Sequence, residues 1–161
     1  NEIDHKKAVT GIAYSKNNAK VSIVGVVDKP GVAADVFEPI GKNNINIDMV
    51  IQNTSLDGKT ANITFTIKQE DLNKTLNIIE KNKKKISYNK LTHNDKLAKV
   101  SIIGAGMIAS PGVTYKMFRS LADEKINILA ISTSEIKISV LINEEFIQKA
   151  VKILHKTFGL D

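Results

Sequence analysis

Two Pro-Gly steps, Pro30-Gly31 and Pro111-Gly112, hold the clearest candidate chemistry in this sequence. Each step opens a predicted helix, and the first turn of a helix presents free N–H groups together with the positive end of the helix dipole. That end of a helix favours a carboxylate. A free amino acid has a carboxylate to place there and an ammonium group that needs acceptors nearby. The alternative is structural, because Pro-Gly is also an ordinary tight turn at the start of a helix.

Acceptors for an ammonium group flank these steps. Asp28 lies three residues before Gly31, close enough to face a ligand at the first step. Asn46 and Asn127 follow the two predicted helices and offer amide groups where the next strands begin. Because Pro-Gly and the asparagine recur in register, we favour a binding site over a plain turn.

The sequence holds no constellation typical of an enzyme. His5, His93 and His155 fall in a leader, a linker and the polar face of a predicted helix, without a second histidine or a carboxylate at metal-ligand spacing. There is no Gly-x-Ser-x-Gly motif, no phosphate-binding GxxxxGK[ST] loop and no cysteine. Gly104-Ala105-Gly106 lacks the third glycine and the context of a dinucleotide site. We therefore expect no catalytic residue, no metal site and no cofactor in this chain.

An internal repeat organises the chain. The segment Val21–Gly25 (VSIVG) recurs as Val100–Gly104 (VSIIG), and Ile45-Asn46-Ile47 recurs as Ile126-Asn127-Ile128. The order of the matches is kept, with two extra residues before the second Pro-Gly step. The sequence is therefore a tandem duplication.

Hydrophobic periodicity predicts the elements of the first copy. Pro39 sits awkwardly in its first helix, because an interior proline typically costs about 3 kcal/mol, so we expect a kink or an early end there. The second helix carries Leu72, Leu76 and Ile79 on one face. The predicted strands are Lys20–Val27, Ile45–Thr54, Thr60–Ile67 and Lys85–Leu91, with a turn at Leu56–Lys59.

The second copy is one strand short. Its predicted strands are Lys99–Ala105, Ile126–Thr133 and Ile136–Ile142, and its predicted helices are Pro111–Glu124 and Glu144–Phe158, with Gly159 as the stop. The apolar run Val9–Tyr14 precedes the first copy and can supply the missing strand, which would cover an open sheet edge. We therefore predict an α+β protein of two ferredoxin-like βαββαβ units, the first inserted into the second. Residues 16–94 would form the first unit, and residues 8–15 with 97–161 the second.

The charge and composition of the chain indicate whether nucleic acid is a partner. The formal charge of +6 is concentrated in the lysines of residues 81–85, after acidic residues earlier in the same predicted helix, which is the order that a helix dipole favours. An RNA-recognition module is also a βαββαβ fold, but no strand here has its Lys/Arg-Gly-Phe type of pattern. We therefore expect no nucleic acid as a partner.

Compartment can also be predicted from composition. No apolar run approaches the roughly 20 residues of a membrane span, and no signal-peptide pattern is present at the N-terminus. The absence of cysteine is compatible with a cytoplasmic protein. Because the sequence begins with Asn1 and not Met, we expect it to be part of a longer protein.

Two blocks of this sequence resemble a known family. Asp28–Gly31 with Asn46–Asn53 is similar to the first ACT unit of aspartate kinases, and Gly104–Met107 with Pro111–Thr114 and Ile131–Ile136 is similar to the second. The similarity runs from about Val9 to Leu160 and points to the lysine- and threonine-sensitive bacterial type, whose regulatory region is also made separately as a β subunit. The kinase signature Lys-Phe-Gly-Gly-Thr-Ser is absent. The resemblance implies that catalysis, with its ATP and magnesium, belongs to a kinase domain outside this chain.

The resemblance also implies two effector sites between ACT units, built across a homodimer. A threonine site would use Asp28, Gly31, Val32, Ala33 and Gln52, with Asn127 and Ile128 from the partner unit. A lysine site would use Asn46 and Asp48, with Ser110, Gly112, Val113, Thr114, Ser134 and Glu135 opposite. Asp48 and Glu135 would suit the second ammonium group of lysine. Ala109 occupies the place aligned with Asp28, so the two corners should not bind the same ligand.

The function that the resemblance implies is regulatory. Lysine and threonine would be effectors for feedback inhibition of the aspartate-family amino-acid pathway, and the partner would be the catalytic domain or α subunit of aspartate kinase. An ACT-type sensor of another metabolic enzyme or a transcriptional regulator is the alternative. The block Ser132–Ile136 argues against that alternative.

Overall fold

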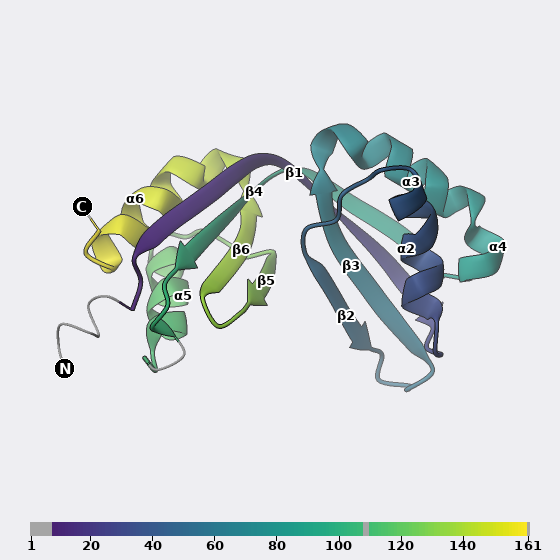
Figure 1. Cartoon of the computed structure of the whole chain (residues 1–161), viewed down its shortest axis with the longest axis horizontal. Helices are drawn as coiled ribbons and strands as arrows, with labels where there is room; N and C mark the ends of the chain where they lie inside the picture. The colour runs from purple at the N-terminus through teal and green to yellow at the C-terminus, as the bar shows by residue number, and fades with distance from the viewer. Residues whose placement is uncertain (1–7, 108–109, 161) are drawn as a thin grey trace. The chain divides into compact units, whose positions relative to one another are not determined.

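The computed structural model describes residues 8–107 and 110–160, which divide into two compact units. The first unit is Asn17–Lys96, and the second unit is the chain up to Lys16 together with the chain from Leu97 onward. Strands β1 (Gly11–Val27) and β4 (Lys90–Ile103) each contribute to both units (Figure 1). The predicted fold class is confirmed: two βαββαβ units, the first inserted into the second.

The first unit is a four-stranded sheet with helices on one face (Figure 1). Its strand order is β2-β3-β1-β4, and the β1–β3 and β2–β3 pairs are antiparallel. A single 3₁₀ turn, Gln69–Asp71, leads from β3 into α3. Besides β1 and β4, the elements are α2 (Val32–Lys42), β2 (Val50–Thr54), β3 (Thr60–Lys68), α3 (Leu72–Lys81) and α4 (Lys83–Ile86).

The second unit repeats this plan with the order β1-β4-β6-β5. The N-terminal half of β1 is its fourth strand, as the incomplete second copy predicted. The other elements are α5 (Val113–Asp123), β5 (Ala130–Thr133), β6 (Lys137–Asn143), a 3₁₀ turn at Glu144–Phe146 and α6 (Ile147–Thr157). No helix in the described part of the chain has the length and apolar composition needed to cross a bilayer.

Each unit has its own hydrophobic core between sheet and helices. Alternate strand residues face the helices, as the two-residue period of a strand requires. Full burial of an aliphatic side chain typically contributes about 1.5–3 kcal/mol, so these residues dominate the stability of each unit. The first core includes Val21, Ile23, Val36, Ile40, Ile63, Phe65 and Ile79, and the second includes Val100, Ile102, Met117, Leu121, Val140, Ile142 and Leu154.

The N-terminal segment docks on β4 through a close backbone approach at Gly104. A Cβ atom at Gly104 would overlap the carbonyl oxygen of Ala8, so glycine is required by space at this position. The Thr10 N–H donates to the Ile103 carbonyl at 2.7 Å, and Ala8 is buried. The first unit has the equivalent backbone bond, from the Asn89 N–H to the Val24 carbonyl at 2.9 Å, but its Gly25 faces the Asn89 side chain.

The second strand of each copy is shorter than predicted. The predicted strand Ile45–Thr54 begins only at Val50, and the predicted strand Ile126–Thr133 begins at Ala130. In the first copy the Met49 N–H donates to the Thr66 side-chain hydroxyl (2.9 Å) and not to a strand carbonyl. Ile45 and Met49 are nevertheless buried, which explains why the apolar pattern suggested a longer strand.

The predicted strand Lys85–Leu91 was wrong over most of its length. Its first residues belong to α4, and β4 begins only at Lys90. Ile86 and Tyr88 are buried and imitate a strand period, while Ser87 has a left-handed φ of 52° that turns the chain. His93, which we expected in a linker, lies exposed on β4.

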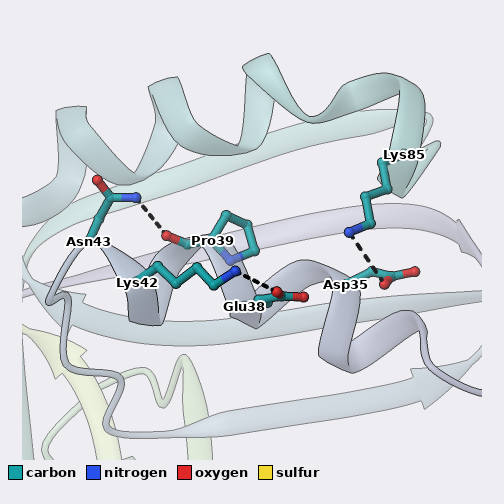
Figure 2. Close-up of polar contacts among 6 residues, drawn as sticks. All are labelled: Asp35, Glu38, Pro39, Lys42, Asn43 and Lys85. Carbon is teal, nitrogen blue, oxygen red and sulfur yellow. Dashed lines mark hydrogen bonds and ion pairs between the residues drawn. The ribbon is translucent and has the colours of Figure 1, made fainter.

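Helix α2 runs through Pro39 to Lys42, so of the predicted kink or early end, the helix does not end at the proline (Figure 2). The Asn43 side-chain amide donates to the Pro39 carbonyl at 2.7 Å and closes the last turn. Lys42 hydrogen-bonds Glu38 at 2.7 Å, which lowers the pKa of that carboxyl group. The burial of Val36 and Ile40 on either side of the proline offsets its cost.

Helix α6 ends at Thr157, and Gly159 follows it as the predicted stop. Gly159 has a φ of 65°, and the Leu160 N–H donates to the His155 carbonyl at 2.9 Å. This is the Schellman arrangement, in which a left-handed glycine lets the chain satisfy the last carbonyls of a helix. His155 lies in the last turn of α6.

The close approach at Gly104 predicts that alanine substitution lowers stability at Gly104 but not at the nearby Gly106. Gly104→Ala should lower the free energy of unfolding by about 1–3 kcal/mol, because the added methyl group forces the backbone of the N-terminal segment away. Gly106→Ala is the matched control, since its Cβ would lie 3.5 Å from the Ala8 Cα atom, an ordinary contact. Urea unfolding midpoints provide the measurement. Equal midpoints for the two variants would show that the N-terminal segment is not docked at Gly104.

Candidate functional site

The two Pro-Gly corners have the same backbone conformation. Gly31 precedes α2 with φ 91° and ψ −7°, and Gly112 precedes α5 with φ 93° and ψ −9°. Residues with side chains rarely adopt this left-handed region. A Cβ at either glycine would meet nothing within 4 Å, so glycine is required by the backbone angle and not by space.

Each corner presents the start of a helix that no side chain caps. The Gly31 carbonyl accepts from the Asp35 N–H and the Gly112 carbonyl accepts from the Lys116 N–H, both at 2.9 Å, which are the first helical bonds. The Val32 and Val113 N–H groups turn back to the Lys29 and Ser110 carbonyls at 3.2 and 3.4 Å, and the next N–H groups of each first turn have no carbonyl to receive them within the helix. Both corners can therefore receive a carboxylate.

Asp28 lies at the end of β1, directly before the first corner. Its N–H donates to the Lys59 carbonyl at 3.0 Å, and one of its carboxylate oxygens accepts from the Thr54 hydroxyl at 3.4 Å. The side chain is exposed, so the carboxylate is held in position and remains open to a ligand. Thr54 is a contact that the sequence did not suggest, because its proximity comes from the β2–β3 hairpin.

The other predicted site residues of the first unit differ in how far their side chains are exposed. Val32 is buried in the core, and Ala33 is half-buried in the first turn of α2. Gln52 is exposed on β2. Asn46 and Asp48 are exposed in the segment that leads to β2.

The predicted residues of the second unit lie in three places. At the corner, the Ser110 carbonyl accepts from the Val113 N–H at 3.4 Å, and Thr114 is exposed in the first turn of α5. Before β5, Asn127 is exposed and Ile128 packs against the core. Between β5 and β6, Ser134 and Glu135 are exposed, and Ala109 lies outside the described residues.

Neither unit contains a complete set of predicted residues. The threonine set takes Asp28, Gly31, Val32, Ala33 and Gln52 from the first unit, and Asn127 and Ile128 from the second. The lysine set takes Asn46 and Asp48 from the first unit and its remaining members from the second. Both sets therefore remain predictions.

The two corners differ in charge. Three acidic positions of the first copy, Asp28, Asp35 and Asp48, correspond in the repeat to Ala109, Lys116 and Leu129. Asp35 is paired with Lys85 at 3.9 Å (Figure 2). The backbone feature that suits a carboxylate is thus present twice, whereas the groups that suit an ammonium are concentrated in the first copy.

The edge strands carry exposed apolar side chains that sequence reasoning missed. Val50 on β2 and Ile131 on β5 are 52% and 40% exposed and occupy equivalent repeat positions. Strands β2 and β5 stand at the two ends of the strand order, so each presents an open edge. The repeat itself could have signalled these residues, because both copies place a branched apolar residue there.

The described residues offer no metal site. No group of three or more histidines, cysteines, aspartates or glutamates lies close enough together there to hold an ion.

A protein-family model described as the ACT domain matches this chain twice, over residues 21–82 and 100–158. These matches correspond to the two copies of the internal repeat.

The curated relatives that match nearly the whole of this chain are aspartate kinases. The chain is 44% identical to the aspartate kinase of Pseudomonas fluorescens over 153 residues, which is 95% of this chain and 37% of that protein. It is 46% identical to the aspartokinase of Mycolicibacterium smegmatis over 154 residues, 94% of this chain and 36% of that protein. The chain thus spans little more than a third of these relatives.

Two solved structures match over nearly their whole length. One, described as aspartokinase alpha and beta subunits, is 44% identical with a TM-score of 0.87, covering 94% of this chain and 99% of that chain. The other is the ligand-free regulatory subunit of aspartate kinase from Thermus thermophilus, 35% identical with a TM-score of 0.86 and the same coverage.

The left-handed corner predicts opposite effects for two glycines of the first unit. Gly31→Ala should destabilise the protein by about 1–2 kcal/mol, because an L-residue is strained at this φ. Gly41→Ala should leave stability unchanged or raise it by up to about 1 kcal/mol, because Gly41 lies within α2 and its Cβ would enter open space. Chemical unfolding of both variants makes the comparison. If Gly31→Ala were as stable as Gly41→Ala, the corner would not hold this conformation in solution.

Proposed function

Since this chain belongs to the ACT-domain family, as the regulatory region of an aspartate kinase, we propose that it senses free amino acids and inhibits the kinase by feedback. The observation that carries the proposal is the match to a Thermus thermophilus regulatory subunit over 99% of that subunit's length. A protein that consists of this pair of units alone is named a regulator. The absence of any kinase signature from this sequence agrees with such a role.

The chemistry of the corners favours a free amino acid as the ligand. An uncapped helix start suits the ligand carboxylate, and the exposed carboxylate of Asp28 suits its ammonium group. We assign threonine to the first corner, with Gln52 nearby in the sheet and Asn127 from a partner unit. We assign lysine to the second corner, where the equivalent of Asp28 is Ala109 and the carboxylates would be Asp48 and Glu135.

The proposed sites require a homodimer. Each set of residues draws on both kinds of unit, and the open edges of β2 and β5 expose Val50 and Ile131. Packing an ACT unit of one chain against an ACT unit of another would cover these edges and bring the two parts of each site together. Exposed apolar residues on a free edge are otherwise an aggregation risk.

The proposed control is a shift between two arrangements of the dimer. A ligand that bridges two units binds the closed arrangement better than the open one, and only that difference can shift the equilibrium. The closed dimer would hold the catalytic domain or α subunit in a poorly active state. ATP and magnesium would act in that catalytic part, in the cytoplasm, and the sensing units would touch neither.

The role of Asp28 provides the test. Asp28→Ala should weaken threonine binding about 10-fold or more, because a hydrogen bond to a charged group typically contributes about 1.5–3 kcal/mol. Folding should change little, since Asp28 is exposed and its backbone bond to Lys59 is unaffected. Calorimetric titration with threonine is the measurement, and Asp95→Ala, which removes another exposed carboxylate of the same unit, is the control. Unaltered threonine affinity in Asp28→Ala would place the ligand elsewhere.

A further inference from the structure

A hollow of about 440 Å³ lies within the second unit, where the N-terminal segment meets the start of α5 and the end of α6. Its walls include the apolar side chains of Val9, Val113 and Phe158. Two lysines, Lys116 and Lys156, also line it, and none of the described residues that line it is acidic. The volume falls within the range typical of small-molecule sites.

The equivalent place in the first unit is filled by the chain itself. The bonds from Thr10 to Ile103 and from Asn89 to Val24 are equivalent, so the residues before them, Val9 and Tyr88, occupy corresponding positions. Tyr88 is 8% exposed, with the Lys83 ammonium 5.0 Å from the centre of its ring. A tyrosine ring thus occupies the space that the smaller valine leaves open in the second unit.

The charge at this place also differs between the units. In the first unit Asp35 forms an ion pair with Lys85 at the end of α4 (Figure 2). In the second unit the residue equivalent to Asp35 is Lys116. Lys156 on α6 corresponds to Lys81 on α3. Among the described residues, an ion-paired corner in the first copy thus corresponds to a hollow lined by two lysines in the second.

We propose that this hollow binds a small molecule that joins an apolar or aromatic body to one anionic group, a carboxylate or a phosphate. The Lys116 ammonium lies 6.0 Å from the centre of the Phe158 ring, so a positive charge and an apolar wall stand side by side. An anion between Lys116 and Lys156 gains charge-assisted hydrogen bonds, while its body covers Val9 and Phe158. A free amino acid fits poorly, because its ammonium group would meet two lysines. The hollow therefore selects a different class of ligand from the effector sites, although it shares Val113 with the proposed lysine set.

The test is a titration of the isotope-labelled protein, followed through its backbone amide signals. The probes are benzoate, phenyl phosphate and the neutral benzyl alcohol, which separate carboxylate, phosphate and apolar contributions. One or both anions should saturably shift the signals of Val9, Val113 and Phe158, and benzyl alcohol should bind much more weakly. The double variant K116E/K156E should bind the anion at least about 10-fold more weakly. K81E, which changes the equivalent lysine of the first unit, should bind it as the unchanged protein does.

A second variant tests the shape of the hollow. Val9→Tyr copies the residue of the first unit and should fill the space, so anion binding should be lost while lysine and threonine binding is kept. The charge variants change exposed side chains and decide the question even if Val9→Tyr folds poorly. The proposal is overturned if both anions bind no better than benzyl alcohol, or if K116E/K156E binds them as well as K81E.

Discussion

The contact between the Ala8 carbonyl and the Cα atom of Gly104 requires glycine at position 104, because no side chain fits between them. Once the N-terminal segment is seated there, Thr10 bonds Ile103 and β1 becomes the fourth strand of a sheet whose other strands lie more than 80 residues further along the chain. β1 then continues into the first unit, and β4 returns from it. The two units therefore share two strands, and neither sheet is complete without them.

Duplication has kept the backbone of the corners and changed the groups around them. Gly31 and Gly112 have nearly identical φ and ψ angles, whereas the acidic positions of the first copy carry Ala109, Lys116 and Leu129 in the second. A helix start that receives a carboxylate depends on backbone geometry alone, so it survives changes of side chain. Discrimination between ligands depends on the surrounding charges, and these are what differ. One fold can thus present two corners with different preferences.

The duplication, the fold class and the corners could be predicted from the sequence, because they depend on local patterns that occur twice. The errors arose where an apolar pattern continues outside a regular strand: Ile45 and Met49 are buried before β2 begins, and Ile86 and Tyr88 imitate a strand across a left-handed turn. Pro39 remained within α2 because tertiary packing outweighs local propensity. The hollow beside Lys116 had no sequence signal of its own, since it depends on Val9 standing where the first unit has Tyr88.

The central claim is that the two corners act on one equilibrium of a dimer. Two ligands that favour the same closed state must strengthen each other's binding, typically by about 1–3 kcal/mol, and by the same factor in both directions. The direct measurement is calorimetric: the affinity for lysine with and without saturating threonine, and then the affinity for threonine with and without saturating lysine. The account predicts tighter binding in both pairs, by equal factors. Equal affinities in both pairs would contradict it and leave two independent sensors on the same fold.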